Sequence, residues 1–136
     1  MFRHMRRNAR YCGAALAGVF LLANPGQAQG PELKMLDTLT KGNWNLRIRD
    51  DGSQRSVCVR DGREFVQLQH RESGCSRFVV NDGPNAVTVQ YTCRGNGYGR
   101  TSIRREGDGL VQIQTQGIHN GTPFSYSAEG RHAGRC

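Results

Sequence analysis

Apolar and polar residues alternate along a series of short segments from Gly42 to the end of the chain. In the first segment, residues 42–49, the side chains of Trp44, Leu46 and Ile48 share one face and polar side chains share the other. A period of two predicts a β-strand with one buried face and one solvated face. Further strands are predicted over residues 55–59, 100–105, 110–116 and 124–130, and in both arms of a hairpin over residues 75–93.

Turn-forming residues recur every eight to twelve positions between these segments, and no strand–helix–strand spacing is present. This pattern is typical of antiparallel sheets whose strands follow one another along the chain. We therefore predict an all-β domain with one short helix. Its single antiparallel meander of about seven strands is expected to curl into a half-barrel or a small barrel.

The hairpin is the strongest local signal, because residues 81–85 (NDGPN) bend a backbone easily. Phe78 and Val80 alternate on the first arm and are predicted to share one face. The alternating apolar positions of the second arm are Val87, Val89, Tyr91 and Cys93.

The short helix is predicted over residues 61–70, where the β pattern breaks. Asp61 can cap its first turn, and Glu64 stands three residues later, as in a capping box. Phe65 and Leu68 share one face at helical spacing.

Residues 1–28 have the features of a secretory signal peptide rather than of a folded segment. Arginines precede an apolar run over residues 12–23, and small residues precede the expected cleavage site. The apolar run is shorter than the roughly 20 residues that span a bilayer, which disfavours a transmembrane anchor. We predict cleavage after Ala28 and a periplasmic location. Arg6 and Arg7 leave both the general and the twin-arginine export routes open.

After the leader, residues 29–41 are interpreted as an N-terminal lead-in and residues 42–136 as the β domain. Leu33, Leu36 and Leu39 fall at helical spacing in the lead-in and allow a short helix there.

The net charge falls once the leader is removed. All 11 acids lie after it, against 15 of the 19 lysines and arginines, so the mature chain carries +4. Such a charge is ordinary for solubility. The arginines are scattered singly or in pairs, which disfavours nucleic acid as a partner. We expect a monomer without a membrane span after cleavage.

Four cysteines remain after the leader: Cys58, Cys75, Cys93 and Cys136. An even number in a small exported domain predicts two disulfides, with three pairings open. Folding the hairpin brings Cys75 and Cys93 nearly opposite each other, so we favour that pair, which leaves Cys58 with Cys136. The spacings of 17, 18 and 43 residues differ from those of zinc ligands. We therefore predict no metal and no other cofactor.

The histidines of the mature chain are His70, His119 and His132, and none lies in a hydrolase motif. We therefore assign no catalytic residue. Two histidines with a carboxylate can perform general acid–base catalysis on a phosphodiester, which keeps a small basic nuclease among the hypotheses. The glycines of residues 95–99 lie between two strands and not before a helix. We interpret them as a bend or bulge, not as a phosphate-binding loop.

Several short motifs of the β domain stand in a characteristic order. They are Gly42-Asn43-Trp44, Cys58, Cys75, Tyr91-Thr92-Cys93, Gly130-Arg131 and Gly134-Arg135-Cys136. In this order and spacing the chain resembles a family of small exported four-cysteine β domains of unknown function that is common in Proteobacteria. The resemblance implies a disulfide-stapled antiparallel β fold in the periplasm, without known catalytic residues.

A second resemblance is local. Residues 89–95 (VQYTCRG) are similar to the Tyr-x-Cys signature of periplasmic lysozyme inhibitors, which are small β-barrels with a disulfide. This resemblance implies an inhibitor of a cell-wall hydrolase. C-type lysozymes are strongly basic, however, and would repel a partner of charge +4 on approach.

Three functions therefore stand as hypotheses. The first is a non-enzymatic binding or structural module of the cell envelope. It would hold an envelope polymer, an apolar small molecule or a protein on a concave sheet face or a loop rim. The second is the hydrolase inhibitor, and the third is the small basic hydrolase.

Overall fold

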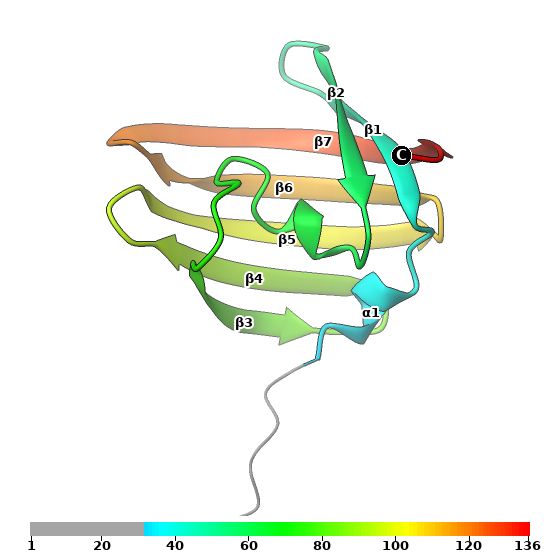
Figure 1. Ribbon diagram of the computed structural model, residues 1–136, viewed down its shortest axis with the longest axis horizontal. Helices are drawn as coiled ribbons and strands as arrows, with labels where there is room; N and C mark the ends of the chain where they lie inside the picture. The colour runs from blue at the N-terminus through cyan, green and yellow to red at the C-terminus, as the bar shows by residue number, and fades with distance from the viewer. Residues whose placement is uncertain (1–31) are drawn as a thin grey trace, which may run out of the picture.

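A computed structural model describes residues 32–136 (Figure 1). The predicted leader and its cleavage site after Ala28 lie outside the described residues. The strands, in chain order, are β1 (Gly42–Ile48), β2 (Gln54–Val59), β3 (Ser76–Asp82), β4 (Ala86–Cys93), β5 (Gly97–Gly107), β6 (Leu110–His119) and β7 (Thr122–Gly134). Two single helical turns, α1 (Lys34–Asp37) and the 3-10 turn η1 (Arg63–Phe65), complete the described elements. The all-β prediction is confirmed.

All seven strands belong to one antiparallel sheet in the order β2-β1-β7-β6-β5-β4-β3. Strands β3 to β7 form a meander, and the β1–β2 hairpin is added beside β7, with Asn45 opposite Arg131. The edge strands β2 and β3 do not pair with each other, so the sheet stays open. The half-barrel is therefore the correct alternative, and the closed small barrel is wrong.

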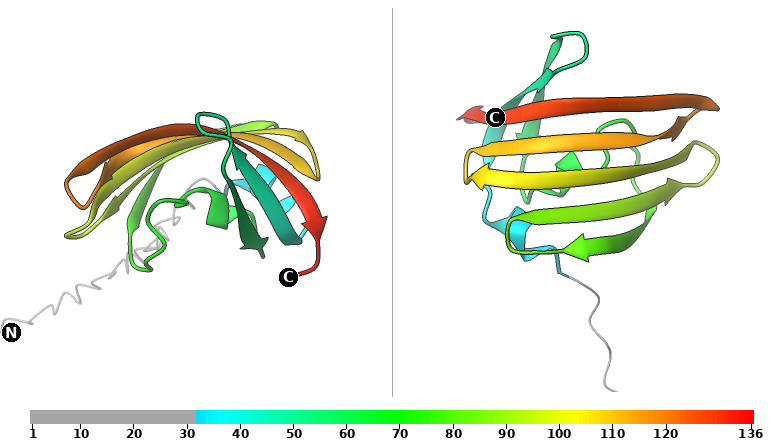
Figure 2. Two further views of the ribbon diagram at one scale, coloured as in Figure 1. Left: turned by 90° about the horizontal axis from the view of Figure 1, so that it is seen from above. Right: turned by 180° about the vertical axis from the view of Figure 1, so that it is seen from behind.

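The hydrophobic core fills the concave side of the sheet. Figure 2 shows the sheet arching over α1 and the segment that contains η1. Leu33, Leu36 and Leu39 of the lead-in are buried in the same cluster as strand residues. The indole of Trp44 on β1 packs edge-on against Phe65, with ring centroids 5.2 Å apart. These elements fill the concave side between the two unpaired edges of the sheet.

The predicted helix over residues 61–70 is reduced to the turn η1. Its capping interactions do form: the Asp61 carboxylate accepts from the N–H of Arg63 at 3.0 Å, and the Glu64 carboxylate accepts from the N–H of Asp61 at 3.4 Å. The helix stops because Phe65, Val66, Gln67, Leu68 and His70 are all buried. One amphipathic helix cannot bury such a continuous run. Instead the Thr101 hydroxyl donates to the carbonyl of Val66 at 2.7 Å.

The two apolar side chains that alternate on the first arm of the central hairpin are exposed. Phe78 and Val80 are 69% and 41% exposed, whereas Val79 packs against the core opposite Val89. A register shift between Val79 and Asn81 interrupts the pairing there. The alternating apolar residues of the second arm, Val87, Val89, Tyr91 and Cys93, are all buried.

Strands β5, β6 and β7 are longer than predicted, and glycine explains part of the difference. A Cβ on Gly99 would lie 2.3 Å from the Tyr91 hydroxyl oxygen, and a Cβ on Gly117 would lie 2.0 Å from the carbonyl oxygen of Tyr98. Residues 94–96 form the predicted bend between β4 and β5, whereas Gly99 and Gly117 allow a buried ring and a neighbouring strand to approach the backbone.

Both predicted disulfides are confirmed. Cys58 of β2 is bonded to Cys136, and Cys75, just before β3, is bonded to Cys93 at the end of β4. Across residues 32–136, no helix is long and apolar enough to cross a membrane.

Candidate functional site

The outer, convex face of the sheet is the broadest surface that α1 and η1 leave uncovered (Figure 2). Strand register places its side chains in rows that run across β4, β5, β6 and β7. One row contains Thr88, Ser102, Gln114 and Ser127, a second contains Gln90, Arg100, Gln116 and Ser125, and a third contains Ala86, Arg104, Gln112 and Glu129. We call these twelve residues the outer polar face. Amide, hydroxyl and guanidinium groups dominate it.

A hydrogen-bonded network occupies one end of the outer polar face. The amide nitrogen of Gln112 donates to the carboxylates of Glu106 and Glu129, at 3.1 Å each. Its amide oxygen accepts from the guanidinium of Arg49. Arg104 forms an ion pair with Glu106 at 2.9 Å. The hydrogen bond from Gln112, followed by that from Arg131, lowers the pKa of Glu129 below its usual value.

Arg100 lies at the other end of the outer polar face and is exposed. Within residues 32–136 its guanidinium forms no ion pair and no hydrogen bond. A shallow hollow of about 360 Å³ surrounds it, lined by Gln90, Tyr98, Gln116 and Ser125 among others. A second hollow of about 350 Å³, near the Gln112 network, includes Arg49 and Arg104. A third hollow, of about 330 Å³, is lined by Arg100, Gln114 and Gln116 among others, so arginines line all three depressions of the face.

Two aromatic side chains stand at the margin of the same face. Tyr98 of β5 is 50% exposed and precedes Arg100 by two residues, so both point outward from one strand. Phe78 of β3 lies opposite Gln90 and is 69% exposed. Exposed rings beside amide and guanidinium groups can stack against a flat or ring-shaped ligand.

The structure brings two of the three candidate histidines together. The His70 and His119 rings lie edge-on with centroids 4.9 Å apart. His70 is fully buried, with Nδ1 2.9 Å from the Tyr91 hydroxyl and Nε2 3.0 Å from the carbonyl oxygen of Asn96. Because a carbonyl only accepts, Nε2 donates to Asn96 and Nδ1 accepts from Tyr91. Both nitrogens of His70 are therefore engaged.

The groups around His70 and His119 stabilise the fold. Burial raises the pKa of Tyr91 to about 12, so its phenol stays neutral. The pKa of Glu72 is lowered by a backbone hydrogen bond and by the hydrogen bond from the Asn96 amide. The third candidate lies elsewhere: the His132 ring packs edge-on against Trp44, and its Nε2 donates to the carbonyl of Lys41 at 3.1 Å.

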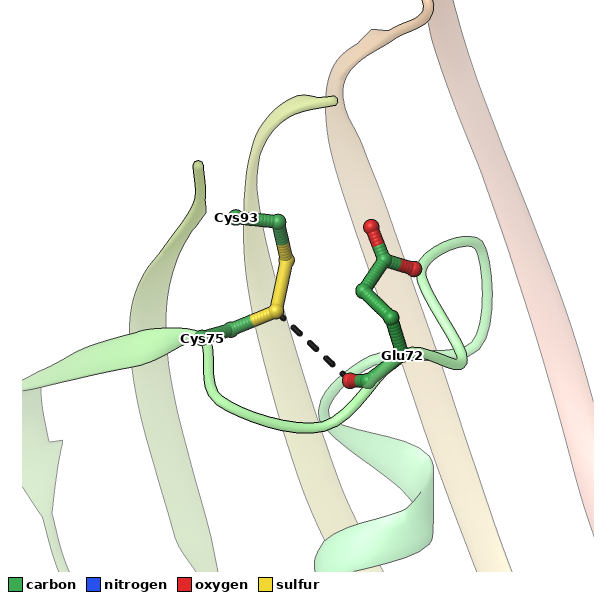
Figure 3. A group of neighbouring side chains, drawn as sticks. All are labelled: Glu72, Cys75 and Cys93. Carbon is green, nitrogen blue, oxygen red and sulfur yellow. Dashed lines mark hydrogen bonds between the residues drawn. A yellow bond between two sulfur atoms is a disulfide. The ribbon is translucent and has the colours of Figure 1, made fainter. Parts of the chain in front are cut away.

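Glu72, Cys75 and Cys93 form the one group of potential metal-ligating side chains found within residues 32–136 (Figure 3). The two sulfur atoms are joined in the disulfide, so neither is a thiolate that could bind a metal. Cys75 Sγ lies 3.6 Å from the Glu72 carbonyl oxygen, a contact without a hydrogen to share. Only one carboxylate remains, and we assign no metal site to this group.

A hollow of about 400 Å³ lies on the opposite side of the molecule, between β2 and residues 64–73. Its polar groups largely satisfy one another. Arg77 donates to the Gln67 side chain at 2.8 Å, and Gln67 donates to the carbonyl of His70 at 3.2 Å. Both signs of charge line it, from Arg71 and Glu72. We therefore place the candidate binding surface on the outer polar face.

Comparison with protein-family models, with curated proteins and with solved structures gives no match. The candidate site therefore rests on the geometry of this chain.

Sequence reasoning did not select the outer polar face. Arg100 and Arg104 lie on one strand, β5, but the amide and hydroxyl groups around them come from β4, β6 and β7, and only the strand register places these groups together. The available signal was the polar half of each alternating strand, for example Gln112, Gln114 and Gln116 in β6.

Proposed function

We propose that this protein is an exported, non-enzymatic binding module that docks a polar polymer of the cell envelope on its outer polar face. The observation that carries the proposal is the uncovered set of amide, hydroxyl and guanidinium groups on four adjacent strands. Neighbouring strands lie about 4.8 Å apart, so these groups repeat at a spacing suited to a chain of hydroxyl-bearing sugar units. An envelope glycan is the polymer class that this surface favours.

Export to the periplasm remains part of the proposal. Two disulfides are typical of proteins from oxidising compartments, and they agree with the signal-peptide pattern of residues 1–28. We expect the N-terminus of the exported protein to be Gln29.

The concave face, an alternative docking surface, is filled by core residues. Binding on the outer face is therefore the better-supported form of the module.

The two other hypotheses have less support. A two-histidine hydrolase needs both imidazoles free to exchange protons, but His70 uses both nitrogens internally. In the segment that resembles lysozyme inhibitors, Tyr91 and Cys93 are buried, and Cys93 is in a disulfide. That signature is therefore carried by core residues rather than by a surface that could contact an enzyme.

Co-sedimentation with purified peptidoglycan and other insoluble envelope polysaccharides tests the proposal. The protein is exported from the full-length chain and purified with its disulfides intact. Gln114→Ala combined with Gln116→Ala removes two side-chain amides and should weaken retention about tenfold, since hydrogen bonds contribute about 0.5–1.5 kcal/mol each. Gln54→Ala combined with Ser56→Ala removes exposed polar groups from β2, the far edge of the sheet, and should leave retention unchanged. Failure of the wild-type protein to bind any envelope polymer would contradict the proposal.

A further inference from the structure

We infer that the hollow around Arg100 is a subsite for a sugar residue that carries an anionic group. In this subsite the Arg100 guanidinium binds the carboxylate or phosphate, and Tyr98 packs against the sugar ring. The inference rests on the proposed function and names the ligand class for one part of the same face.

The guanidinium of Arg100 carries a positive charge. Two other arginines around this face are neutralised within the molecule: Arg104 pairs with Glu106 at 2.9 Å, and Arg131 pairs with Glu129 at 2.7 Å. Arg47, opposite Glu129 on β1, lies outside the hollow that Gln90, Tyr98 and Gln116 form. Arg100 has no such partner among residues 32–136. A planar guanidinium can give a carboxylate or phosphate two parallel hydrogen bonds, and this charge-assisted geometry is stronger than a neutral pair. An anionic group is therefore the complement that this position lacks.

The neighbours of Arg100 on the adjacent strands are uncharged amides. Gln90 and Gln116 lie directly opposite it on the two adjacent strands. Both amides are exposed and present a donor and an acceptor each, as the hydroxyl groups of a sugar require. An acid at either position would have neutralised Arg100 from within. Neutral amides leave its charge available to a ligand.

The aromatic ring of Tyr98 lies next to Arg100 on the same face. Tyr98 lies two residues before Arg100, which places the two side chains about 7 Å apart along β5 on the same face. That separation allows one sugar unit to contact the ring while its anionic substituent reaches the guanidinium. Single-stranded nucleic acid would instead favour several stacked aromatic side chains along a continuous basic groove. Here the Arg49 end of the face is joined to carboxylates through Gln112.

Matched oligosaccharides test the subsite. Binding of oligogalacturonate and of its methyl ester is measured by calorimetry, because esterification removes the charge of the carboxyl group and leaves the sugar chain unchanged. We expect wild-type protein to bind the acid at least about tenfold more tightly, with an advantage that declines between low and high salt. Arg100→Gln should abolish that difference, because it weakens binding of the acid much more than binding of the ester. Tyr98→Ala should weaken binding of both ligands.

Controls separate the subsite from general electrostatics. Arg60→Gln removes another exposed arginine, one that faces Glu64 in the segment after β2, and should preserve the preference for the acid. A phosphorylated oligosaccharide tests whether phosphate replaces carboxylate. Melting temperatures confirm that every variant is folded.

Three outcomes would overturn the inference. Equal affinity for acid and ester, or an Arg100→Gln effect no larger than that of Arg60→Gln, removes the anionic subsite while the polymer-binding proposal stands. Tighter binding of oligothymidylate than of any acidic oligosaccharide at the same salt concentration replaces the ligand class with nucleic acid. If wild-type protein binds neither oligosaccharides nor any envelope polymer, the proposed function fails together with the inference.

Discussion

Tyr91 joins several parts of the molecule through one side chain. Its ring lies over Gly99, where a Cβ would be 2.4 Å from the phenol carbon Cζ. Its hydroxyl donates to His70 in the segment that covers the concave face. This segment has no long helix to stabilise it, so a buried hydrogen bond to the sheet is one of the contacts that fix its position.

Replacing Tyr91 with Phe should destabilise the fold by about 1–3 kcal/mol. The ring remains, but Nδ1 of the fully buried His70 loses its donor, and an unsatisfied buried acceptor carries the full desolvation cost. Urea unfolding monitored by circular dichroism measures the change. The control is Tyr98→Phe, which removes a hydroxyl from a half-exposed ring and should change stability by less than about 0.5 kcal/mol. Equal effects of the two substitutions would show that the His70 contact is not stabilising.

The two disulfides staple different elements and should stabilise them to different extents. The Cys58–Cys136 bridge spans 78 residues and joins β2 to the segment after β7, whereas Cys75–Cys93 spans 18 and joins β3 to β4. In the chain-entropy model the longer loop contributes about 4.5 kcal/mol and the shorter about 3 kcal/mol. Cys58→Ala with Cys136→Ala should therefore lower the free energy of unfolding more than Cys75→Ala with Cys93→Ala.

Alanine is the replacement of choice because Cys93 is buried, and serine there would add a buried hydroxyl. The single variants provide the control for connectivity. Cys58→Ala and Cys136→Ala should have matching melting temperatures, and Cys75→Ala and Cys93→Ala should match each other. Any other grouping would contradict the pairing.

The elements that sequence predicted well are those whose pattern depends only on neighbouring residues. The alternation of Trp44, Leu46 and Ile48 indicates the buried face of β1, and the alternation of apolar residues from Val87 to Cys93 indicates that of β4. The alternation of Phe78 and Val80 does not show which face they occupy, and both are exposed on β3, an edge strand with a register shift. The helix predicted over residues 61–70 is reduced to one turn because contacts with Thr101 and Tyr91, distant in sequence, determine the shape of this segment.

The candidate site could not be predicted from the sequence, because its residues become neighbours only in the folded sheet. Arg100, Gln90 and Gln116 meet only through the pairing of three strands. Their alternation with buried residues predicts that they are exposed, but not which side chains become neighbours. Register depends on the whole meander, including turns whose lengths were predicted only approximately.

At the scale of the whole molecule, carboxylates with lowered pKa are spread over the surface. The pKa of Asp37 is lowered mainly by the hydrogen bond from Arg63, that of Asp51 by Ser53, and that of Glu129 by Gln112. The pKa of Glu72 is lowered mainly by a backbone hydrogen bond. The Asp37–Arg63 pair, at 2.6 Å, also connects α1 to η1 beneath the sheet.

Acid should therefore destabilise the protein. A carboxyl group with a lower pKa in the folded state contributes stability above its unfolded pKa, here 3.8 for Asp37 and Asp51 and 4.5 for Glu72 and Glu129. That contribution is lost as the pH falls through the lower, folded values, so the urea midpoint should decline from about pH 5 downward. Asp37→Asn and Arg63→Gln should each make this decline shallower, and the double variant should add nothing further, because both remove the same pair. A midpoint independent of pH in the wild-type protein, or additive effects in the double variant, would show that this pair does not link protonation to folding.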